Sequence, residues 1–422
     1  MSRKNINIGL FGFGCVGFGL YEALQKTPSL KTNIKRICVK SKNKSRPIFN
    51  ENFTFDKDDI LNDNEINTVV ELIDDADAAF DIVKTALQKG KAVVTANKKM
   101  IAEHFSELLE LQKKYNVPLL YEAACCASIP IIRNLEEYYD NDLLESVEGI
   151  VNGSTNYILT NTSLKNITYN AALKEAQDKG YAETNPLLDV GGFDAKYKLI
   201  ILIAHAFGII VKPDDVFNIG IDKLGELELN YAKEKGYKIK LIAFAEKKEN
   251  GKIISFVLPK FINEKDKLYS VDDVYNAVKT KSYFSDTQFF IGKGAGAFPT
   301  ASAVLSDISA LTFDYRYEYK KLNTNESLEN ESFIFLKIFL RFDLSNVEEL
   351  KSYFVEVNEC YQNFNSGYII GVVTLKKLKI LSFFSTTSVV LFDVVKQVEL
   401  IKKQNLTSCS LNHTNCNYTK VI

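Results

Sequence analysis

The sequence predicts an α/β protein in three parts, the first of them built on a doubly wound parallel sheet. Two observations predict that sheet. An N-terminal strand passes through a glycine-rich turn directly into a helix, and strands then alternate with helices as far as residue 122. The length of the chain predicts the two further parts, because 422 residues are more than one hydrophobic core ordinarily organises.

The composition is that of a globular protein and excludes several classes. The 52 basic and 53 acidic residues give a net charge of −1, so we expect neither a nucleic-acid partner nor an anionic membrane surface. No apolar run is long enough to span a bilayer, and the basic start of the chain leads into a glycine turn rather than a secretory h-region. The seven cysteines form no C-x-x-C pair. These features predict a cytoplasmic protein with reduced thiols.

The first strand, residues 5–11, and the turn after it predict a dinucleotide-binding loop. The turn and the start of the next helix form a G-x-G-x-x-G pattern that consists of Gly12, Phe13, Gly14, Cys15, Val16 and Gly17. Glycines at these positions let backbone N–H groups approach a pyrophosphate at a helix N-terminus. A purely structural glycine turn is the alternative, but it is less expected between a strand and a helix.

The second strand, residues 34–39, ends at a residue that indicates which dinucleotide binds. Lys40 stands where an NAD-specific site would present an acidic residue to the ribose 2′-hydroxyl, and Lys42, Lys44 and Arg46 follow in the same turn. A cationic turn favours the 2′-phosphate of NADP, so we expect NADP first and NAD second. A solvated basic loop without a ligand is the alternative.

Three more strands, at 68–73, 91–95 and 117–122, complete the predicted sheet, with a helix at 78–89. Lys98 follows the strand at 91–95, within the sequence Thr-Ala-Asn-Lys of residues 95–98. Doubly wound sheets bind their ligands at the carboxyl ends of the strands. Lys98 is therefore a candidate site residue.

The polar stretch at 180–198 opens an apolar helix. It contains Glu183, Asp189, Asp194 and Lys198 beside turn-forming glycines. Asp194 and Lys198 are four residues apart, so they share one face of the helix. A solvated ion pair is the ordinary interpretation of this spacing, but residues 199–204 are too apolar for a surface helix. We expect a partly dehydrated lysine with a lowered pKa that donates a proton.

This stretch closely resembles the active-site signature of homoserine dehydrogenases. Three further segments resemble motifs of that family besides the glycine turn: Thr-Ala-Asn-Lys at 95–98, Asn-Gly-Ser-Thr-Asn-Tyr at 152–157 and Gly-Ala-Gly-Ala-Phe-Pro-Thr-Ala at 294–301. The resemblance covers roughly residues 5–310. It implies an NAD(P)-dependent oxidoreductase that reversibly reduces L-aspartate 4-semialdehyde to L-homoserine in threonine, methionine and isoleucine biosynthesis.

The resemblance also implies roles for individual residues. Lys198, held by Asp194, would protonate the developing alkoxide while Lys98 polarises the carbonyl oxygen, and the two lysines could exchange these roles. The small-molecule substrate would be bound by Glu183 and Asp189 at its ammonium, by Gly153 and Thr155 at its carboxylate, and also by Asp194 and Tyr181. Beyond the glycine turn, the expected cofactor contacts are Lys40, Lys98 and Gly296.

A monovalent cation such as Na⁺ or K⁺ is the second bound group that the resemblance implies. In this family backbone carbonyls of the loop after the fifth strand hold the cation. The corresponding residues here are Glu122, Cys125, Ala127 and Ile129, in a loop that lacks the usual glycines.

The expected domains follow from these motifs. A Rossmann-type dinucleotide-binding domain covers residues 1–130 and is completed by 294–320. An α+β catalytic and dimerisation domain covers 131–293, with strands at 237–245 and 253–258. After a polar linker, residues 321–422 resemble a regulatory ACT-like module, with strands at 333–342, 367–375 and 388–392 and helices at 346–355 and 394–403. A homodimer or homotetramer is expected.

Two other functions stay open from the sequence. An acylating semialdehyde dehydrogenase would use Cys125 or Cys126 as a nucleophile, although no histidine lies near them in sequence to activate a thiol. A buried small cysteine is the plainer interpretation. A non-catalytic NADP-binding redox sensor would need no paired acids and lysines.

Overall fold

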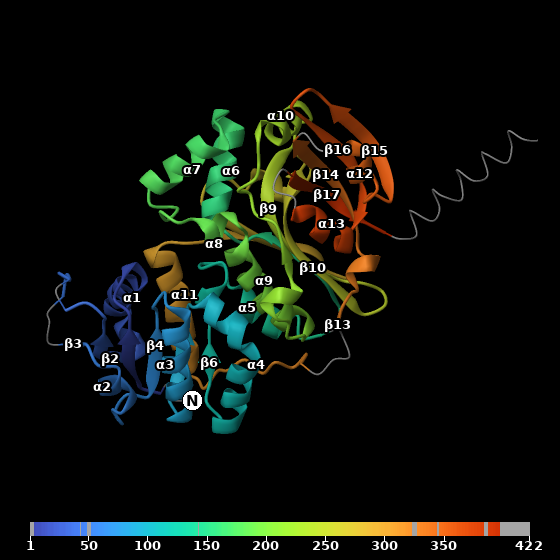
Figure 1. Ribbon diagram of the computed structural model, residues 1–422. Helices are drawn as coiled ribbons and strands as arrows, with labels where there is room; N and C mark the ends of the chain where they lie inside the picture. Colours follow the sequence, from blue (N-terminus) through green and yellow to red (C-terminus); the bar gives the residue numbers. More distant parts are fainter. Residues whose placement is uncertain are drawn as a thin grey trace, which may run out of the picture. The chain divides into compact units, whose positions relative to one another are not determined.

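A computed structural model describes residues 4–42, 44–48, 52–141, 143–322, 327–343, 346–383 and 387–396 (Figure 1). The chain forms two compact units. Unit 1 comprises Met1–Asp222, Lys240–Leu258 and Asn263–Leu328, and unit 2 comprises Lys223–Ile239, Pro259–Ile262 and Glu329–Ile422. No helix among the described residues is long and apolar enough to cross a membrane.

The first sheet of unit 1 is the predicted parallel sheet. Its six strands lie in the order β3-β2-β1-β4-β5-β6, and every pair is parallel. The five predicted strands are confirmed, and the short β3 adds an edge. The strands are β1 (Ile6–Phe11), β2 (Thr32–Cys38), β3 (Phe53–Thr54), β4 (Thr68–Glu71), β5 (Ala92–Thr95) and β6 (Leu119–Leu120).

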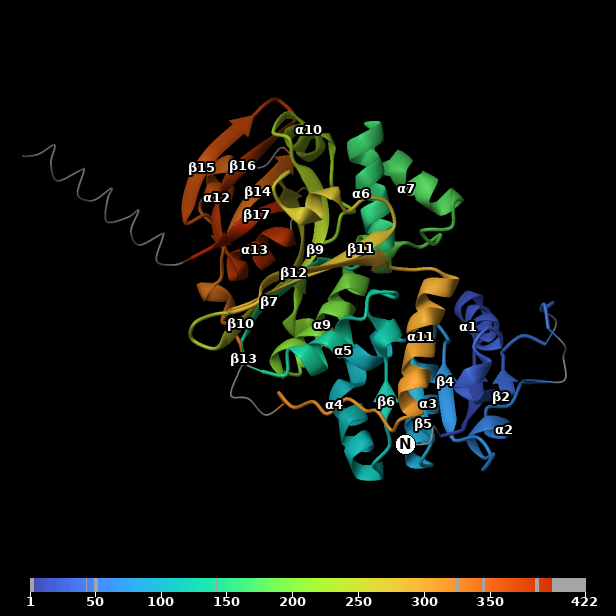
Figure 2. The same ribbon diagram turned by 180° about the vertical axis from the view of Figure 1, so that it is seen from behind.

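Helices cover both faces of this sheet, as a doubly wound fold requires. Two opposite views show α3 (Ala76–Gln88) and α4 (Lys98–Tyr115) on one face, and α1 (Cys15–Gln25) and α11 (Ala297–Leu311) on the other (Figures 1 and 2). The chain thus returns to the sheet through α11, as the glycine-rich segment at 294–301 predicts. Gly19 permits the close approach of α1 to α11, because a Cβ there would lie 2.9 Å from the carbonyl oxygen of Ala297. Shorter helices are α2 (Asp58–Leu61) and α5 (Ile131–Arg133).

The second sheet of unit 1 is mixed. Its main strands follow the order β12-β11-β7-β9-β10, and the sequence analysis missed the hairpin β11–β12. The strands are β7 (Leu144–Ile150), β8 (Phe217–Asn218), β9 (Lys238–Lys247), β10 (Lys252–Ile262), β11 (Tyr275–Ser282), β12 (Asp286–Lys293) and β13 (Ser327–Leu328).

Four helices accompany the second sheet: α6 (Gly153–Lys165), α7 (Tyr169–Asp178), α8 (Leu187–Val190) and α9 (Phe193–Phe207). The central one is α9, which packs against α4 on one side and β7 on the other. Its residues 198–207 are all buried, which explains why its sequence lacks a polar face.

Unit 2 contains a β-α-β-β-α-β sequence of elements. The sheet order β17-β14-β16-β15 is antiparallel throughout, as in a split βαβ fold. The end of β10 and α10 (Glu226–Glu234) belong to the same unit. The other elements are β14 (Phe335–Asp343), α12 (Val347–Lys351), β15 (Glu356–Gln362), β16 (Ser366–Thr374), α13 (Leu375–Ser382) and β17 (Thr387–Val395).

The helix predicted at 394–403 is wrong where the structure describes it. Val394 and Val395 continue β17, where they pair with Leu336 and Phe335 of β14. β-branched residues favour such a ladder over a helix. The rest of that predicted helix, 397–403, lies outside the described residues.

Candidate active site

The N-terminus of α9 places an acid and a lysine side by side. Gly192 adopts a left-handed conformation with φ of 81°, which lets the chain turn sharply into the helix. Asp194 and Lys198 then lie one turn apart, with Asp194 Oδ2 2.7 Å from Lys198 Nζ. Both residues are buried, at 6% and 7% exposure. The pair is therefore not the solvated surface pair that its spacing alone would suggest.

A second lysine completes the cluster from a different element. Lys98 is the first residue of α4, where the chain leaves the carboxyl end of β5, and its Nζ lies 3.0 Å from Asp194 Oδ1. Its side chain is 41% exposed, whereas that of Lys198 is 9% exposed. Lys198 Nζ also donates to the carbonyl oxygen of Val151 at 2.7 Å. One carboxylate thus accepts from two ammonium groups of different exposure.

The charges of this cluster fix its protonation. Burial would raise the pKa of Asp194, but Lys198 and Lys98 outweigh it and hold that pKa well below its ordinary value. Burial alone would lower the pKa of Lys198, but the Asp194 carboxylate raises it above the ordinary value. The expectation of a lowered pKa for Lys198 is therefore wrong. The lysine remains an ammonium that can donate a proton.

Asn152, just before α6, connects the cluster to its surroundings, and sequence reasoning did not single it out. Its Nδ2 donates to Asp189 Oδ1 at 2.7 Å and to Asp194 Oδ2 at 2.8 Å. Its Oδ1 caps α6 by accepting from the N–H of Thr155 at 2.8 Å. The Thr155 hydroxyl donates to the carbonyl oxygen of Asn152, so both donors of Thr155 are occupied. The available sequence signal was an asparagine at the expected start of a helix, where it can act as an N-cap.

The remaining predicted substrate residues lie on or near the loop before α8. Asp189 is half-buried, and burial together with the Asp194 charge raises its pKa. Glu183 and Tyr181 are exposed, with the Tyr181 ring 4.8 Å from that of Tyr157. The structure therefore gathers Asp189 with Asp194 and the lysines, while it leaves Glu183 and Tyr181 on the open side of the loop.

The glycine turn between β1 and α1 has the shape that a pyrophosphate requires. Gly12 has φ of +91°, and a Cβ there would lie 2.6 Å from the carbonyl oxygen of Leu72. A Cβ on Gly17 would lie 2.4 Å from the carbonyl oxygen of Gly12, whereas Gly14 at the helix N-cap faces open space. Backbone N–H groups at the start of α1 are thus accessible to an anion. Lys40 is exposed, two residues after the end of β2.

The loop after β6 holds the four predicted cation ligands. Glu122, Cys125, Ala127 and Ile129 are all buried, and Ala127 lies in the left-handed region with φ of 43°. The carbonyl oxygen of Glu122 accepts from the N–H of Cys125 at 3.2 Å, and that of Ile129 accepts from the N–H of Ile131 at 2.8 Å. Each carbonyl oxygen has a second lone pair. The loop can therefore offer backbone carbonyl oxygens to a cation, although those of Glu122 and Ile129 each already accept one hydrogen bond within the loop.

Acids surround this loop. The Glu122 carboxylate accepts from the N–H groups of Ile132 and Arg133 at 2.8 and 2.9 Å. Asp307 of α11 accepts from the N–H of Glu122 and forms an ion pair with the Arg133 guanidinium at 2.8 Å. Burial raises the pKa of Glu122 to about 8 and that of Asp307 to about 6. Both side chains are engaged within the fold.

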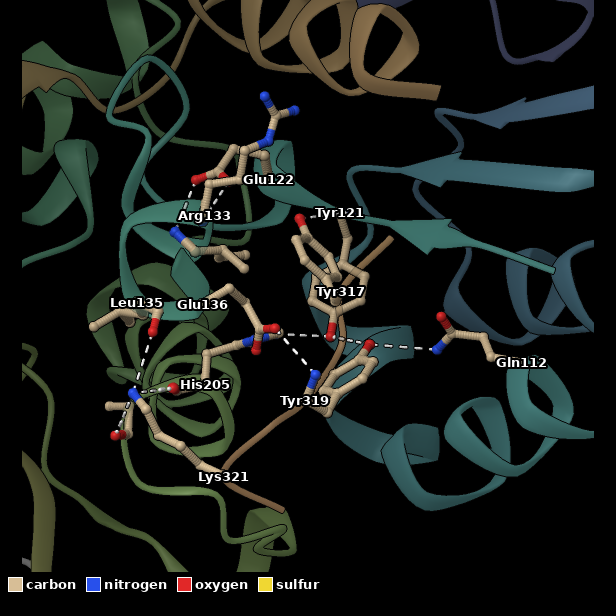
Figure 3. Close-up of polar contacts among 12 residues, drawn as sticks. Gln112, Tyr121, Glu122, Arg133, Leu135, Glu136, His205, Tyr317, Tyr319 and Lys321 are labelled. Carbon is tan, nitrogen blue, oxygen red and sulfur yellow. Dashed lines mark hydrogen bonds and ion pairs between the residues drawn. The ribbon is translucent and has the colours of Figure 1, made fainter. Parts of the chain in front are cut away.

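A buried polar network anchors the far end of α9 (Figure 3). His205 Nδ1 lies 2.6 Å from Glu136 Oε1, and His205 Nε2 lies 2.8 Å from the Tyr121 hydroxyl. The Tyr121 hydroxyl in turn lies 2.8 Å from that of Tyr319, in the segment that follows α11. Lys321 donates to three carbonyl oxygens, including that of His205. The helix that carries Asp194 is thus fixed at both ends.

The two adjacent cysteines do not form a reactive thiol site. Cys125 and Cys126 are 0% and 1% exposed. Burial raises the pKa of Cys125 well above its ordinary value and that of Cys126 to about 12. The thiolate is the reactive form of cysteine, so both side chains behave as small buried hydrophobes.

Two family models match the chain in succession. Residues 12–122 match the NAD binding domain of homoserine dehydrogenase, and residues 130–309 match the model described as homoserine dehydrogenase. Together the two matches cover more than half of the chain and include every element of the cluster around Asp194.

Individual relatives show the same likeness. The homoserine dehydrogenase of Helicobacter pylori is 39% identical over 315 residues, which are 72% of this chain and 73% of the relative. The crystal structure of a homoserine dehydrogenase from Thiobacillus denitrificans superposes with a TM-score of 0.83 at 29% identity, over 93% of this chain and 99% of that one. A hyperthermophilic archaeal homoserine dehydrogenase mutant in complex with NADPH superposes with a TM-score of 0.64 at 28% identity, over 75% and 100%.

Proposed function

The chain belongs to the homoserine dehydrogenase family, and on that premise we propose how its own residues perform the reaction. The enzyme is an NAD(P)-dependent oxidoreductase that interconverts L-aspartate 4-semialdehyde and L-homoserine. The observation that carries the residue assignment is the buried carboxylate of Asp194 between Lys98 and Lys198.

Lys198 is the proposed proton donor. A nicotinamide cofactor, when bound, would supply the hydride that reduces the aldehyde carbon. Lys198 gives the accompanying proton to the carbonyl oxygen, so that the aldehyde becomes an alcohol. Asp194 keeps Lys198 charged before the transfer, as the raised pKa of the lysine indicates. Lys98, which is more exposed, polarises the same oxygen.

The substrate is a small amino acid, and its charged groups find complementary partners. Asp189, Asp194 and Glu183 would bind its ammonium, and Tyr181 would close the open side of the loop. The carboxylate would lie at the N-terminus of α6, at Gly153 and Thr155. Because both donors of Thr155 are occupied, the N–H groups of Gly153 and Ser154 are the ones that the start of a helix leaves available.

The nicotinamide cofactor is proposed to be NADP ahead of NAD. The turn from Gly12 to Gly17 would hold the pyrophosphate, and the exposed Lys40 would meet the 2′-phosphate. Lys98 and Gly296 would contact the nicotinamide half. Gly296 has φ of +117°, a conformation that L side chains rarely adopt.

A monovalent cation, Na⁺ or K⁺, is proposed for the carbonyl oxygens of Glu122, Cys125, Ala127 and Ile129. The buried carboxyl of Glu122 supports this assignment, because a nearby positive charge would favour its ionised form. The cation would order the loop that lies against Lys198, since Cys125 Sγ contacts the Lys198 carbonyl oxygen at 3.7 Å.

The division into residues 1–130 with 294–320, 131–293 and 321–422 is proposed as the functional organisation. The split βαβ topology of unit 2 supports an ACT-like module. A homodimer or homotetramer in the cytoplasm is the proposed working form.

Steady-state oxidation of L-homoserine by the purified protein, followed at 340 nm with NADP and separately with NAD, tests this function. We expect turnover with both cofactors and a higher kcat/KM with NADP. Activity that requires phosphate and is abolished by Cys125→Ala would instead identify the acylating dehydrogenase. Nucleotide binding without turnover of homoserine would identify a sensor.

A further inference from the structure

We propose that Asn152 is a positioning residue that holds Asp189 and Asp194 together and aims them at the substrate, an inference that rests on the proposed roles of these two acids. Asp189 belongs to α8 and Asp194 to α9; Asp194 forms ion pairs with both lysines of the cluster, and their charges also act on Asp189. The amide of Asn152 is the group that donates to both carboxylates at once.

The bonding of Asn152 uses its amide completely. A primary amide has two N–H donors and one carbonyl acceptor group. The two N–H groups reach Asp189 and Asp194 at 2.7 and 2.8 Å, and the oxygen accepts from the N–H of Thr155 at 2.8 Å. Asn152 is 4% exposed, so water does not compete for these bonds. The start of α6 and the two acids are thus fixed relative to one another by one side chain.

Two carboxylates that share one nitrogen partner repel each other. Burial, and then that repulsion, raise the pKa of Asp189, while the Asn152 donor and the charges of Lys198 and Lys98 oppose the rise. Without the Asn152 donor, Asp189 takes up a proton at a higher pH than it does in the intact site. A neutral Asp189 loses the charge with which it attracts the ammonium of the substrate. The amide therefore extends the pH range in which both acids are charged.

Two substitutions separate this role from helix capping. Asn152→Ser retains an N-cap oxygen for the N–H of Thr155 but cannot bridge the two acids. Asn152→Asp retains both the cap and the shape, but places a third carboxylate against the other two. Thr168→Ala is the matched control, because it removes the N-cap of α7, where the Thr168 hydroxyl oxygen accepts from the N–H of Ala171.

We expect kcat/KM for homoserine to fall about 10- to 100-fold in Asn152→Ser, the usual effect of losing hydrogen bonds to charged groups. The acid limb of its pH profile should move to higher pH, because Asp189 then titrates at higher pH. Asn152→Asp should lose more activity at pH 8 and recover part of it as the pH falls, when one of the three acids is protonated. Thr168→Ala should lower the melting temperature without changing kcat/KM for homoserine or its pH profile.

The outcomes are distinct. A wild-type kcat/KM and an unmoved acid limb in Asn152→Ser would overturn the positioning role, as would equal losses in Asn152→Ser and Thr168→Ala. If Asn152→Ser does not fold, Asn152→Asp decides the matter through the direction of its pH dependence, and a profile parallel to that of the wild type overturns the proposal. Failure of the wild-type protein to oxidise homoserine would instead refute the proposed function.

Discussion

Asp194 accepts from two lysines, and their surroundings assign them different tasks. Lys198 lies inside the fold, where it also donates to the Val151 carbonyl oxygen, while Lys98 is half-exposed at the start of α4. A buried ammonium that is paired with a carboxylate keeps its proton until a stronger base appears beside it. The alkoxide that forms during reduction is such a base.

Lys198→Ala should lower kcat by about 10²- to 10⁴-fold, the usual contribution of a positioned general acid. NADPH affinity should stay close to that of the wild type, because Lys198 belongs to the substrate half of the site. Stopped-flow measurement of hydride transfer together with fluorescence titration of NADPH checks both statements. A variant within a few-fold of wild-type kcat would remove Lys198 from the mechanism, and a larger loss in Lys98→Ala would exchange the two roles.

Lys40→Glu should reverse or erase the preference for NADP. A carboxylate at position 40 repels a 2′-phosphate and accepts from a free ribose hydroxyl. The ratio of kcat/KM values for NADP and NAD is the quantity to compare. Lys113→Glu is a control of equal charge change, because Lys113 is exposed in the last turn of α4. Equal ratios in the wild type, or the same shift in the control, would contradict the assignment.

At the scale of elements, a buried carboxyl joins the carboxyl ends of β4 and β5. Glu71 is 0% exposed; it accepts from the N–H of Ile73 at 2.6 Å and from the Thr95 hydroxyl at 2.5 Å. Thr95 in turn accepts from the N–H of Asn97, the N-cap residue of α4. The Glu71 carboxyl, through Thr95, thus fixes the turn that presents Lys98. The sequence did not indicate this role for Glu71.

Glu71 should make stability depend on pH. Burial raises its pKa to about 7, so the folded chain holds a proton that the unfolded chain releases near pH 4.5. The stabilisation is complete below about pH 4.5 and is lost as the pH rises through about 7, at a cost of about 3 kcal/mol. Urea unfolding of Glu71→Gln from pH 5 to 8 should show a smaller decline than the wild type. Glu65→Gln, at an exposed ion pair with Lys35, is the control; an unchanged slope in Glu71→Gln would refute this account.

Element prediction succeeded where local pattern and tertiary environment agreed. The strands at 5–11 and 68–73 and the helix at 78–89 have the periodicity of their environment, and the structure places them there. The hairpin β11–β12 was missed because its turn, between Ser282 and Asp286, contains no glycine, proline or asparagine. The edge strand β15 was missed because its side chains are almost all exposed, so its sequence has no alternation between a buried and an exposed face.

The site was predictable to the extent that its chemistry is local in sequence. The spacing of Asp194 and Lys198 on one helix indicated their pairing, and the structure places them together. The approach of Lys98 to Asp194, and of Asn152 to both acids, depends on how α4, α6 and α9 pack. The predicted direction of the Lys198 pKa shift was wrong for the same reason. Burial, which lowers that pKa, was expected from the apolar helix, but the opposing effect of the Asp194 carboxylate within the fold was not.

At the scale of the whole molecule, unit 2 draws on segments far apart in the sequence. Residues 223–239 and 259–262 join residues 329–422. Arg341 of β14 lies 3.0 Å from Glu228 of α10, and Tyr231 packs its ring against Phe339 and Phe261. The polar stretch after residue 320 suggested that a separate C-terminal module begins there. The sequence could not show that residues 223–239 and 259–262 belong to the same unit, because contacts between segments so far apart have no local signature.

Deletion of residues 323–422 should therefore destabilise what is left. It removes Arg341 from Glu228, whose side chain is 0% exposed, and a broken buried ion pair costs about 3–5 kcal/mol. It also uncovers the ring of Tyr231. Residues 1–322 should be poorly soluble or melt at a lower temperature than the full chain, as thermal unfolding would show.

Arg341→Met in the full chain isolates the charge effect and should lower the melting temperature by itself. Glu228→Gln combined with Arg341→Met should restore part of that loss, because no buried charge then remains without its partner. A soluble, fully active 1–322 fragment with the wild-type melting temperature would show that the tail contributes nothing to the rest.

The close packing of α1 on α11 has a consequence for biosynthesis. Gly19 of α1 contacts Ala297 and Ala301, which the ribosome adds more than 270 residues after α1 is complete. At about 5–20 residues per second that interval lasts roughly 15–55 s. During this time the nascent nucleotide-binding sheet lacks one of its covering helices, and the apolar surface beneath that helix stays uncovered. The chain is thus an expected client of co-translational chaperones, although the strands of this sheet are all synthesised before α11.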